Sequence, residues 1–195
     1  MSVCFRHFSK YVFVFSFTIL LASVFQPVDS CGQEKREPIP AVSLDIPDKV
    51  EFAGMVIPLD RYDMRERFDR EQMAFTYAYA STIVTIKRAN LYFPVIEPIL
   101  KEHGIPDDFK YLALVESNFN TRAFSSAKAA GFWQFMPETA KQYGLEISNG
   151  IDERYHIEKS TEAACRYLKD AYDKFGDWPT VAASYNAGME RISSE

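Results

Sequence analysis

This sequence has few cysteines and few histidines, and it has no excess of basic charge. It has three cysteines and three histidines among 195 residues. Three cysteines, two of them near the N-terminus, do not make a disulfide framework. His7 lies in the first segment, and His103 and His156 have no partners at ligand spacing, so we expect no metal site. The net charge of −5 argues against a nucleic-acid or anionic-membrane binder, which would carry a basic patch.

Strand patterns, internal repeats and nucleotide motifs are missing as well. No segment shows the sustained alternation of apolar and polar residues that predicts a half-buried strand. Neither a Gly-rich phosphate loop nor a Ser-His-Asp pattern is present, and we expect no cofactor. Apolar residues make up 47% of the chain and include 16 Phe and 11 Tyr, which is ample core material. Because these residues recur at helical spacing, we expect an all-α body.

Only one long hydrophobic run occurs, and it lies near the start. A basic stretch precedes the uncharged run from residue 11 to residue 25. At about 15 residues, this run is too short to span a membrane and is typical of a signal peptide. We therefore predict a signal peptide over residues 1–30, and export. Two interpretations stay open for Cys31, namely lipid attachment after cleavage, as in a bacterial lipoprotein, or simple secretion with an incidental thiol.

The segment after the signal peptide is a predicted linker that leads into a helical region. Residues 31–59 are Pro-rich and show no sustained period, as in an extended arm. Residues 60–86 have helical patterning with charges of alternating sign, which predicts a solvated helix face. A second helix is expected to begin near Val95, since Pro98 would remove a hydrogen bond from a helix formed earlier. Together these pieces form a predicted N-terminal helical region over residues 60–104.

Three further helices are predicted toward the C-terminus, over residues 137–143, 157–175 and 178–186. The second has the clearest apolar stripe, and Gly176 directly after it is a typical helix stop. Cys165 lies beside this stripe and is expected to be a small buried residue. Residues 145–156 have no such pattern and are expected to form a loop.

The most informative stretch lies between residues 105 and 137. Pro106 and two aspartates favour a helix start. The apolar stripe at Phe109, Leu112 and Ala113 continues by helical spacing to Glu116. Burial raises the pKa of a carboxyl group, as a general acid at neutral pH requires. The alternative is that Glu116 pairs with a cation or turns to water.

A second apolar set lies on the same predicted helix. Tyr111, Leu114 and Val115 make the helix apolar almost all round. We therefore expect most of this helix to be buried.

Three blocks of sequence then carry a family resemblance. They read E-S-x-F-x-x-x-A-x-S from Glu116, G-F-W-Q-F-M-P from Gly131 and S-Y-N-A-G from Ser184. In this wording and order they resemble the lytic transglycosylase catalytic (SLT) domain of glycoside hydrolase family 23. The resemblance runs from about Tyr92 to Arg191. It implies an all-α, lysozyme-like (goose-type) fold with a substrate groove.

The resemblance also implies an activity. The family cleaves the β-1,4 bond between N-acetylmuramic acid and N-acetylglucosamine in peptidoglycan glycan strands and leaves 1,6-anhydro ends. One carboxyl group, here Glu116, acts as acid and then as base. The expected location is the periplasm or the inner face of the outer membrane, with membrane attachment through the signal segment or a lipid on Cys31. A lysozyme-type hydrolase and a non-catalytic glycan-binding protein are the competing hypotheses.

Six substrate-binding residues are implied in the same way: Ser125, Trp133, Gln134, Tyr143, Tyr185 and Asn186. The structural alternatives are a loop cap for Ser125, a satisfied buried amide for Gln134, and core packing or a helix C-cap for the others. Lys128 stands where the family usually has glycine, which is expected to change the loop conformation. The catalytic domain is predicted over residues 105–195 and is expected to be C-terminally truncated.

Overall fold

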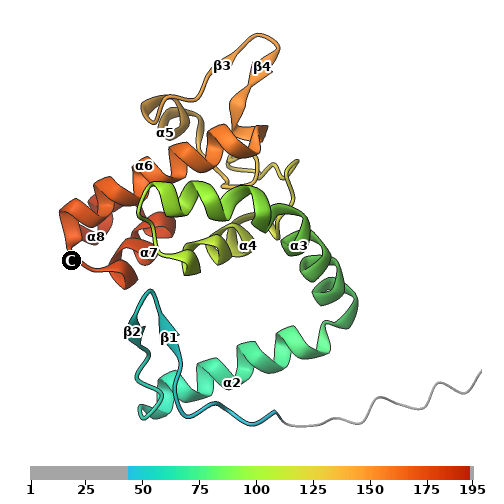
Figure 1. Ribbon diagram of the computed structural model, residues 1–195, viewed down its shortest axis with the longest axis vertical. Helices are drawn as coiled ribbons and strands as arrows, with labels where there is room; N and C mark the ends of the chain where they lie inside the picture. The colour runs from blue at the N-terminus through green and yellow to red at the C-terminus, as the bar shows by residue number, and fades with distance from the viewer. Residues whose placement is uncertain (1–43, 194–195) are drawn as a thin grey trace, which may run out of the picture. The chain divides into compact units, whose positions relative to one another are not determined.

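The computed structural model describes residues 44–193, and helices dominate them (Figure 1). The predicted signal peptide, Cys31 and the first part of the predicted linker lie outside the described residues. The prediction of an all-α fold is confirmed, because the strands in the described part are only two residues long.

A small hairpin occupies the end of the segment that was predicted to be a linker. Strands β1 (Glu51–Phe52) and β2 (Met55–Val56) pair in antiparallel fashion. The backbone N–H of Ala53, in the turn, donates to the Asp108 carboxylate at 2.7 Å. The Phe52 and Phe109 rings lie 5.4 Å apart. An extended arm is therefore wrong for this part, because its aromatic residue finds a partner in the core.

Helices α2 (Tyr62–Tyr77) and α3 (Tyr79–Glu102) follow. No residue of α2 is buried, as the alternating charges predicted. Helix α3 runs through Pro94 and Pro98, so the predicted start near Val95 is wrong. Each proline removes one helical hydrogen bond. Ile96 and Leu100 on the same stretch are almost completely buried, and this packing outweighs the loss. Helix α3 bends along its length (Figure 1), as proline-containing helices do.

The central stretch forms a 3₁₀ helix, η1 (Asp107–Tyr111), followed by α4 (Leu112–Ser117). The predicted stripe is buried, with Phe109 and Ala113 at 0% exposure. The expectation that most of this helix is buried is wrong. Tyr111 is 47% exposed and Val115 is 71% exposed, because only one face of this segment packs on the core.

The C-terminal part contains short and long elements. These are α5 (Pro137–Gln142), β3 (Ile147–Ser148), β4 (Ile151–Asp152), the 3₁₀ turn η2 (Glu153–Tyr155), α6 (Ile157–Phe175), α7 (Trp178–Ala187) and α8 (Met189–Ser193). The predicted loop over 145–156 is thus a hairpin with a 3₁₀ turn. Helix α6 has the predicted bounds and ends at Gly176 in a left-handed conformation, φ 77°. The Asp177 carboxylate caps α7 by accepting from the Thr180 N–H at 2.9 Å.

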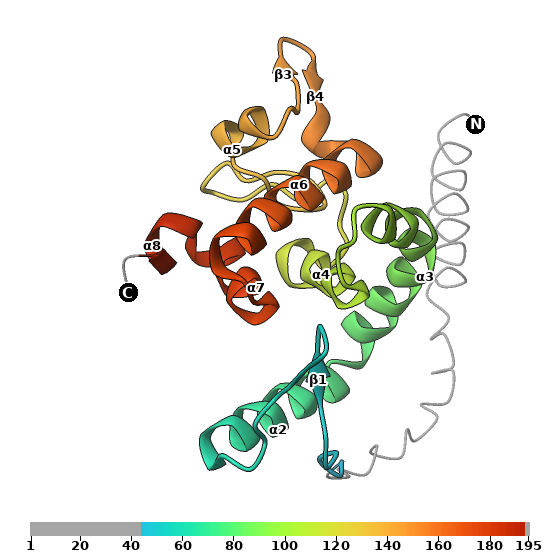
Figure 2. The same cartoon turned by 60° about the vertical axis from the view of Figure 1, so that its left-hand side comes forward.

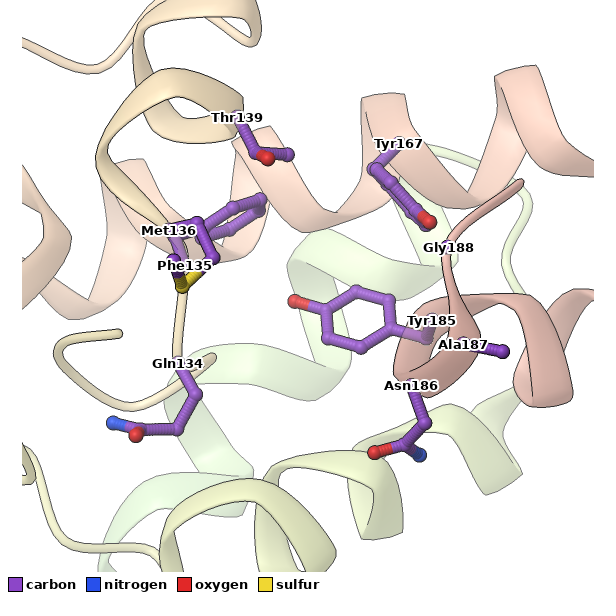
Figure 3. A pocket seen from close by; sticks show the side chains of 9 residues that line it. All are labelled: Gln134, Phe135, Met136, Thr139, Tyr167, Tyr185, Asn186, Ala187 and Gly188. Atoms are coloured by element: carbon purple, nitrogen blue, oxygen red, sulfur yellow. The ribbon is translucent and has the colours of Figure 1, made fainter. Parts of the chain in front are cut away.

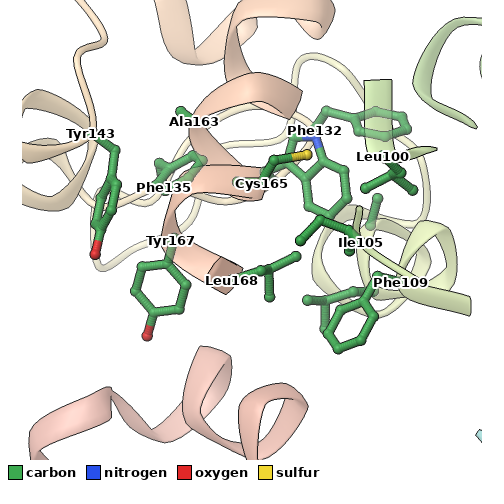
Figure 4. Close-up of a cluster of buried hydrophobic side chains, with 14 of the residues drawn as sticks. Leu100, Ile105, Phe109, Phe132, Phe135, Tyr143, Ala163, Cys165, Tyr167 and Leu168 are labelled. Atoms are coloured by element: carbon green, nitrogen blue, oxygen red, sulfur yellow. The ribbon is translucent and has the colours of Figure 1, made fainter. Parts of the chain in front are cut away.

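Helix α6 is central to the core. It contacts both α3 and α7, and Figure 2 shows it among the surrounding elements. Cys165 and Leu168 on α6 are completely buried and lie in the apolar cluster of Figure 4. The prediction for Cys165 is confirmed. This core supports three segments: the end of α4, the loop over residues 123–136 that follows it closely, and the end of α7, which lies far along the chain from both.

Candidate active site

Glu116 lies on the last turn of α4, and the backbone beyond it is sharply turned. Asn118 and Phe119 both have left-handed φ values, 51° and 54°. Helix α3 holds this turn from the other side. The Thr85 hydroxyl donates to the Asn118 side-chain oxygen at 2.5 Å, and an Arg88 N–H donates to the Asn118 carbonyl at 2.9 Å. The backbone just after Glu116 is thus held by both α3 and α4.

The Glu116 carboxyl group is in an apolar environment. Its Oε1 atom is buried, and within the described residues it has no hydrogen-bond partner. Burial raises the pKa of Glu116 to about 7. A neighbouring cation would lower the pKa instead. The geometry therefore favours a carboxyl that holds its proton near neutral pH over one that is held in an ion pair.

The loop over residues 123–136 approaches α4 and carries Gln134. The Ser117 hydroxyl donates to the Phe132 carbonyl at 2.8 Å, which ties the end of α4 to this loop. The Gln134 amide nitrogen donates to the carbonyls of Ala123 at 3.3 Å and Gly131 at 2.8 Å. Since both partners are acceptors, the nitrogen must face them. The Gln134 amide oxygen therefore faces away from these two carbonyls.

Helix α7 completes the arrangement with Tyr185 and Asn186. The Tyr185 hydroxyl donates to the Trp133 carbonyl at 2.9 Å. Burial raises the pKa of Tyr185 well above its usual value, and the negative charge of Glu116 raises it further. Tyr185 is therefore close enough to Glu116 to sense its charge. Asn186, the next residue, is exposed.

A cavity of about 220 Å³ lies between the loop and α7. Figure 3 shows Gln134 on one side of it and Tyr185 and Asn186 on the other. Nine residues line it: Gln134, Phe135, Met136, Thr139, Tyr167, Tyr185, Asn186, Ala187 and Gly188. None of these nine lining residues carries a carboxylate. Three of the predicted substrate-binding residues thus meet at one cavity. Glu116 is not one of the lining residues, but it is close enough to Tyr185 to affect the pKa of that hydroxyl.

Ser125 closes a tight turn in the same loop. Its hydroxyl oxygen accepts the Ala129 N–H at 3.0 Å, and its backbone N–H donates to the Ala129 carbonyl at 2.9 Å. This is the loop-cap role that was the structural alternative. Ser125 is not in the cavity lining, and a contact with substrate stays a prediction.

The structure does not place the two remaining predicted residues in this cavity. Trp133 is completely buried, and its indole N–H donates to the Thr161 hydroxyl at 2.9 Å. It is a core residue, and the prediction of a sugar-lining role is corrected, because the loop turns its ring inward. Tyr143 is also buried and packs edge-on against Tyr167, at 5.4 Å between centroids. It lines a separate, open depression that includes Asp170.

Sequence reasoning did not identify all of the cavity wall. Tyr167 lies on the apolar stripe of α6, for which the sequence predicts core packing and no contact with substrate. Its hydroxyl donates to the Ser184 carbonyl at 3.0 Å, and its side chain reaches the cavity. A tyrosine in a buried stripe needs a partner for its hydroxyl, and this was the available signal. Met136 and Thr139 had no such signal.

The described part of the chain, residues 44–193, has neither a cluster of metal ligands nor a helix that could cross a membrane. Over that range, no three His, Cys, Asp or Glu side chains are grouped as metal ligands would be. None of the helices there has the length and apolar character needed to cross a membrane.

The second and third sequence blocks meet at one cavity, and the Ser117–Phe132 hydrogen bond ties the first block to the second. Together with the helical fold, this arrangement defines the class of lysozyme-like domains. Within this class, the family model described as "Transglycosylase SLT domain" matches residues 93–195. The chain belongs to this family, and the resemblance found in the sequence is confirmed.

Curated relatives agree with this assignment. The chain is 37% identical to membrane-bound lytic murein transglycosylase D of Escherichia coli (strain K12) over 106 residues, 54% of this chain and 24% of that protein. It is 33% identical to a putative tributyltin chloride resistance protein of Alteromonas sp. (strain M-1) over 119 residues, 58% of this chain and 56% of that protein. It is 34% identical to peptidoglycan transglycosylase gp16 of Escherichia phage T7 over 90 residues, 45% of this chain and 7% of that protein. The matched part thus covers less than two thirds of each of these relatives.

Proposed function

We propose that this chain is an exported lytic transglycosylase. It cleaves the β-1,4 bond between N-acetylmuramic acid and N-acetylglucosamine in peptidoglycan and leaves 1,6-anhydro-muramic acid ends. Membership of the SLT family supports this proposal. So do the names of two relatives, a lytic murein transglycosylase and a peptidoglycan transglycosylase.

The observation that carries the proposal is the state of Glu116. Burial raises the pKa of this carboxyl to about 7, and its buried Oε1 has no partner among the described residues. Near neutral pH a large fraction of the protein therefore has Glu116 protonated. A protonated carboxyl is the group needed to donate to a poor leaving oxygen.

The reaction then needs only one carboxyl group. Glu116 donates its proton to the glycosidic oxygen as the bond from that oxygen to C1 of the muramic acid breaks. The 6-hydroxyl oxygen of the same sugar attacks C1, and its proton passes to the Glu116 carboxylate. The proton count balances, and no water is consumed. Attack from within the same sugar has a high effective concentration, so a second carboxylate is not required.

The other residues bind and orient the sugar. The Gln134 amide oxygen faces away from the two loop carbonyls that its nitrogen contacts, and it accepts a hydrogen bond from a sugar N–H or O–H. Asn186 is exposed at the cavity and offers an amide to the same sugar. The Tyr185 hydroxyl keeps its own proton in a bond to the Trp133 carbonyl, so its oxygen is left to accept. Ser125 contacts the acetamido group by way of its hydroxyl hydrogen, since its oxygen already accepts the Ala129 N–H.

The remaining proposals concern organisation and location. Residues 1–30 direct export, residues 60–104 form an N-terminal helical region, and residues 105–195 form the catalytic domain. The protein acts in the cell envelope, in the periplasm or at the inner face of the outer membrane. The description of one relative as membrane-bound supports an envelope location.

Digestion of purified peptidoglycan by the full chain tests the proposal. The products are separated and identified by mass spectrometry. We expect anhydro ends, which are lighter by one water molecule than reducing ends, and no products from the Glu116→Gln variant. Reducing ends alone would establish a lysozyme-type hydrolase. Glycan binding with no products from either protein would establish a binding module.

A further inference from the structure

Arg154 is a buried cation outside the cavity lining. It lies in the turn η2 and is only 4% exposed. Its Nε and Nη2 atoms donate to the two carboxylate oxygens of Asp152, at 2.9 and 2.7 Å. This two-pronged ion pair neutralises the charge and fixes the plane of the guanidinium group. One nitrogen, Nη1, is left to contact other parts of the protein.

That nitrogen bridges two points of the loop that carries Gln134. Nη1 donates to the Lys128 carbonyl at 2.8 Å and to the Phe135 carbonyl at 3.0 Å. The first partner lies in the turn closed by Ser125, and the second directly follows Gln134. The loop also packs against the η2 backbone, since a Cβ on Gly131 would lie 1.8 Å from the Arg154 carbonyl oxygen. The guanidinium thus holds both halves of the loop together.

The loop needs such support because of its backbone conformation. Lys128 and Gln134 have φ values of 71° and 48°. A left-handed conformation is unfavourable for residues with a Cβ. Lys128 carries one of the two carbonyls that accept from Arg154. Gln134 directly precedes Phe135, which carries the other. The Gln134 amide also bonds the Ala123 and Gly131 carbonyls, so we expect loss of the Arg154 bonds to let the two left-handed residues relax toward negative φ and shift the amide without unfolding the loop.

We propose that Arg154 is a positioning residue that sets Gln134 and Ser125 in their substrate-binding geometry. The proposal rests on the proposed function, since it concerns how that glycan site is held. Arg154 acts on the sugar only by way of the loop. It therefore determines how well the site binds and orients glycan, beyond any contribution to the stability of the fold.

The test compares two arginine-to-lysine variants of the full chain. Arg154→Lys keeps the charge but loses the planar fork, so it cannot hold Asp152 and two carbonyls together. Arg166→Lys is the control. Arg166 also donates two N–H groups to a backbone carbonyl, that of Tyr143, at 3.2 and 2.6 Å, but its side chain is more exposed and it lies outside the proposed glycan site. We expect kcat/KM to fall about 10- to 100-fold in Arg154→Lys, as misplaced binding groups cause. The kcat/KM of the control should stay within about twofold of the wild-type value.

A second substitution separates positioning from stability. Glycine adopts positive φ without strain, so Lys128→Gly added to Arg154→Lys should restore kcat/KM several-fold. The proposal is overturned if wild type is active and Arg154→Lys loses no more activity than the control, or if the added glycine restores nothing.

Binding in the Glu116→Gln background provides a readout without turnover. An N-acetylglucosamine oligomer should bind about 10-fold more weakly when Arg154→Lys is added. If wild type makes no anhydro ends, the proposed function fails, while this binding comparison still decides the role of Arg154. Equal affinity of the Glu116→Gln protein with and without Arg154→Lys would overturn the positioning role.

Discussion

Replacing Glu116 with glutamine should raise the stability of the protein while it abolishes turnover. The folded protein holds this carboxyl where burial raises its pKa from 4.5 to about 7. A carboxyl that is harder to ionise in the folded state destabilises that state once it is ionised. The amide of glutamine has almost the same shape and never ionises, so the variant avoids this cost.

The size of the effect follows from the two pKa values. Each unit of pKa difference corresponds to about 1.4 kcal/mol, so the step from 4.5 to about 7 corresponds to about 3.4 kcal/mol for a group without contact to water. Glu116 is only partly buried, and solvent screening leaves about 1–2 kcal/mol. For a protein of this length, that is a rise in Tm of about 3–6 °C.

The dependence on pH gives the prediction its direction. Below pH 4.5, the usual value for this group, the carboxyl is protonated in the folded and unfolded states, and the two proteins should have the same Tm. Between pH 4.5 and about 7 the unfolded state ionises first, so the wild type loses stability and the variant does not. The Tm difference should therefore grow over this window and stay constant above it.

Thermal unfolding followed by circular dichroism from pH 4 to pH 9 measures this difference. Glu138→Gln is the matched control, since the Glu138 side chain is 90% exposed, and its Tm should follow that of the wild type. A variant at Glu116 that is less stable than wild type at pH 8 would show that the carboxylate is stabilised by a partner. A Tm difference that does not change with pH would equally refute the account of a buried, unpaired acid.

Three further predictions concern rate and stability. The kcat/KM should fall about tenfold per pH unit above about pH 7, because Glu116, with its pKa near 7, must be protonated; a rate that is flat up to pH 9 would contradict this. Gly131→Ala should destabilise by about 3 kcal/mol or more in urea unfolding, since the new Cβ would stand 1.8 Å from a backbone oxygen at φ 79°. Gly150→Ala, at φ 93° with open space around it, should cost only about 1–2 kcal/mol; equal costs would refute the steric argument. Trp133→Phe should cost about 1–3 kcal/mol by leaving the Thr161 hydroxyl without its donor, while glycan affinity stays within about twofold; a large loss of affinity at unchanged stability would restore a sugar-contacting role for Trp133.

Where a local signal and the tertiary packing agreed, the sequence was sufficient to predict the element. Helix α6 has its predicted bounds because its apolar stripe and the Gly176 stop are local signals. The stripe that ends at Glu116 was equally readable, since helical spacing alone places position 116 on the same face as Leu112. The three blocks of the site could also be recognised in order, because their residue types and spacings are local.

Features that depend on distant partners were not readable from the sequence. Helix α3 continues through Pro94 and Pro98, since the burial of its apolar face compensates for the missing hydrogen bonds. Val115 is exposed and Trp133 is buried, although both are apolar, because only the packing of other segments decides which face is covered.

The candidate site likewise has features that the sequence predicts and features that only the tertiary structure decides. The sequence by itself determined that an acidic residue would end a buried stripe and that Gln134, Tyr185 and Asn186 would belong to one family pattern. Only the tertiary structure decided that Gln134, Tyr185 and Asn186 meet at one cavity, and that the Glu116 Oε1 atom is buried without a hydrogen-bond partner among the described residues. The reason is physical: the pKa of a carboxyl depends on the atoms around it, and those atoms come from segments far apart in the chain.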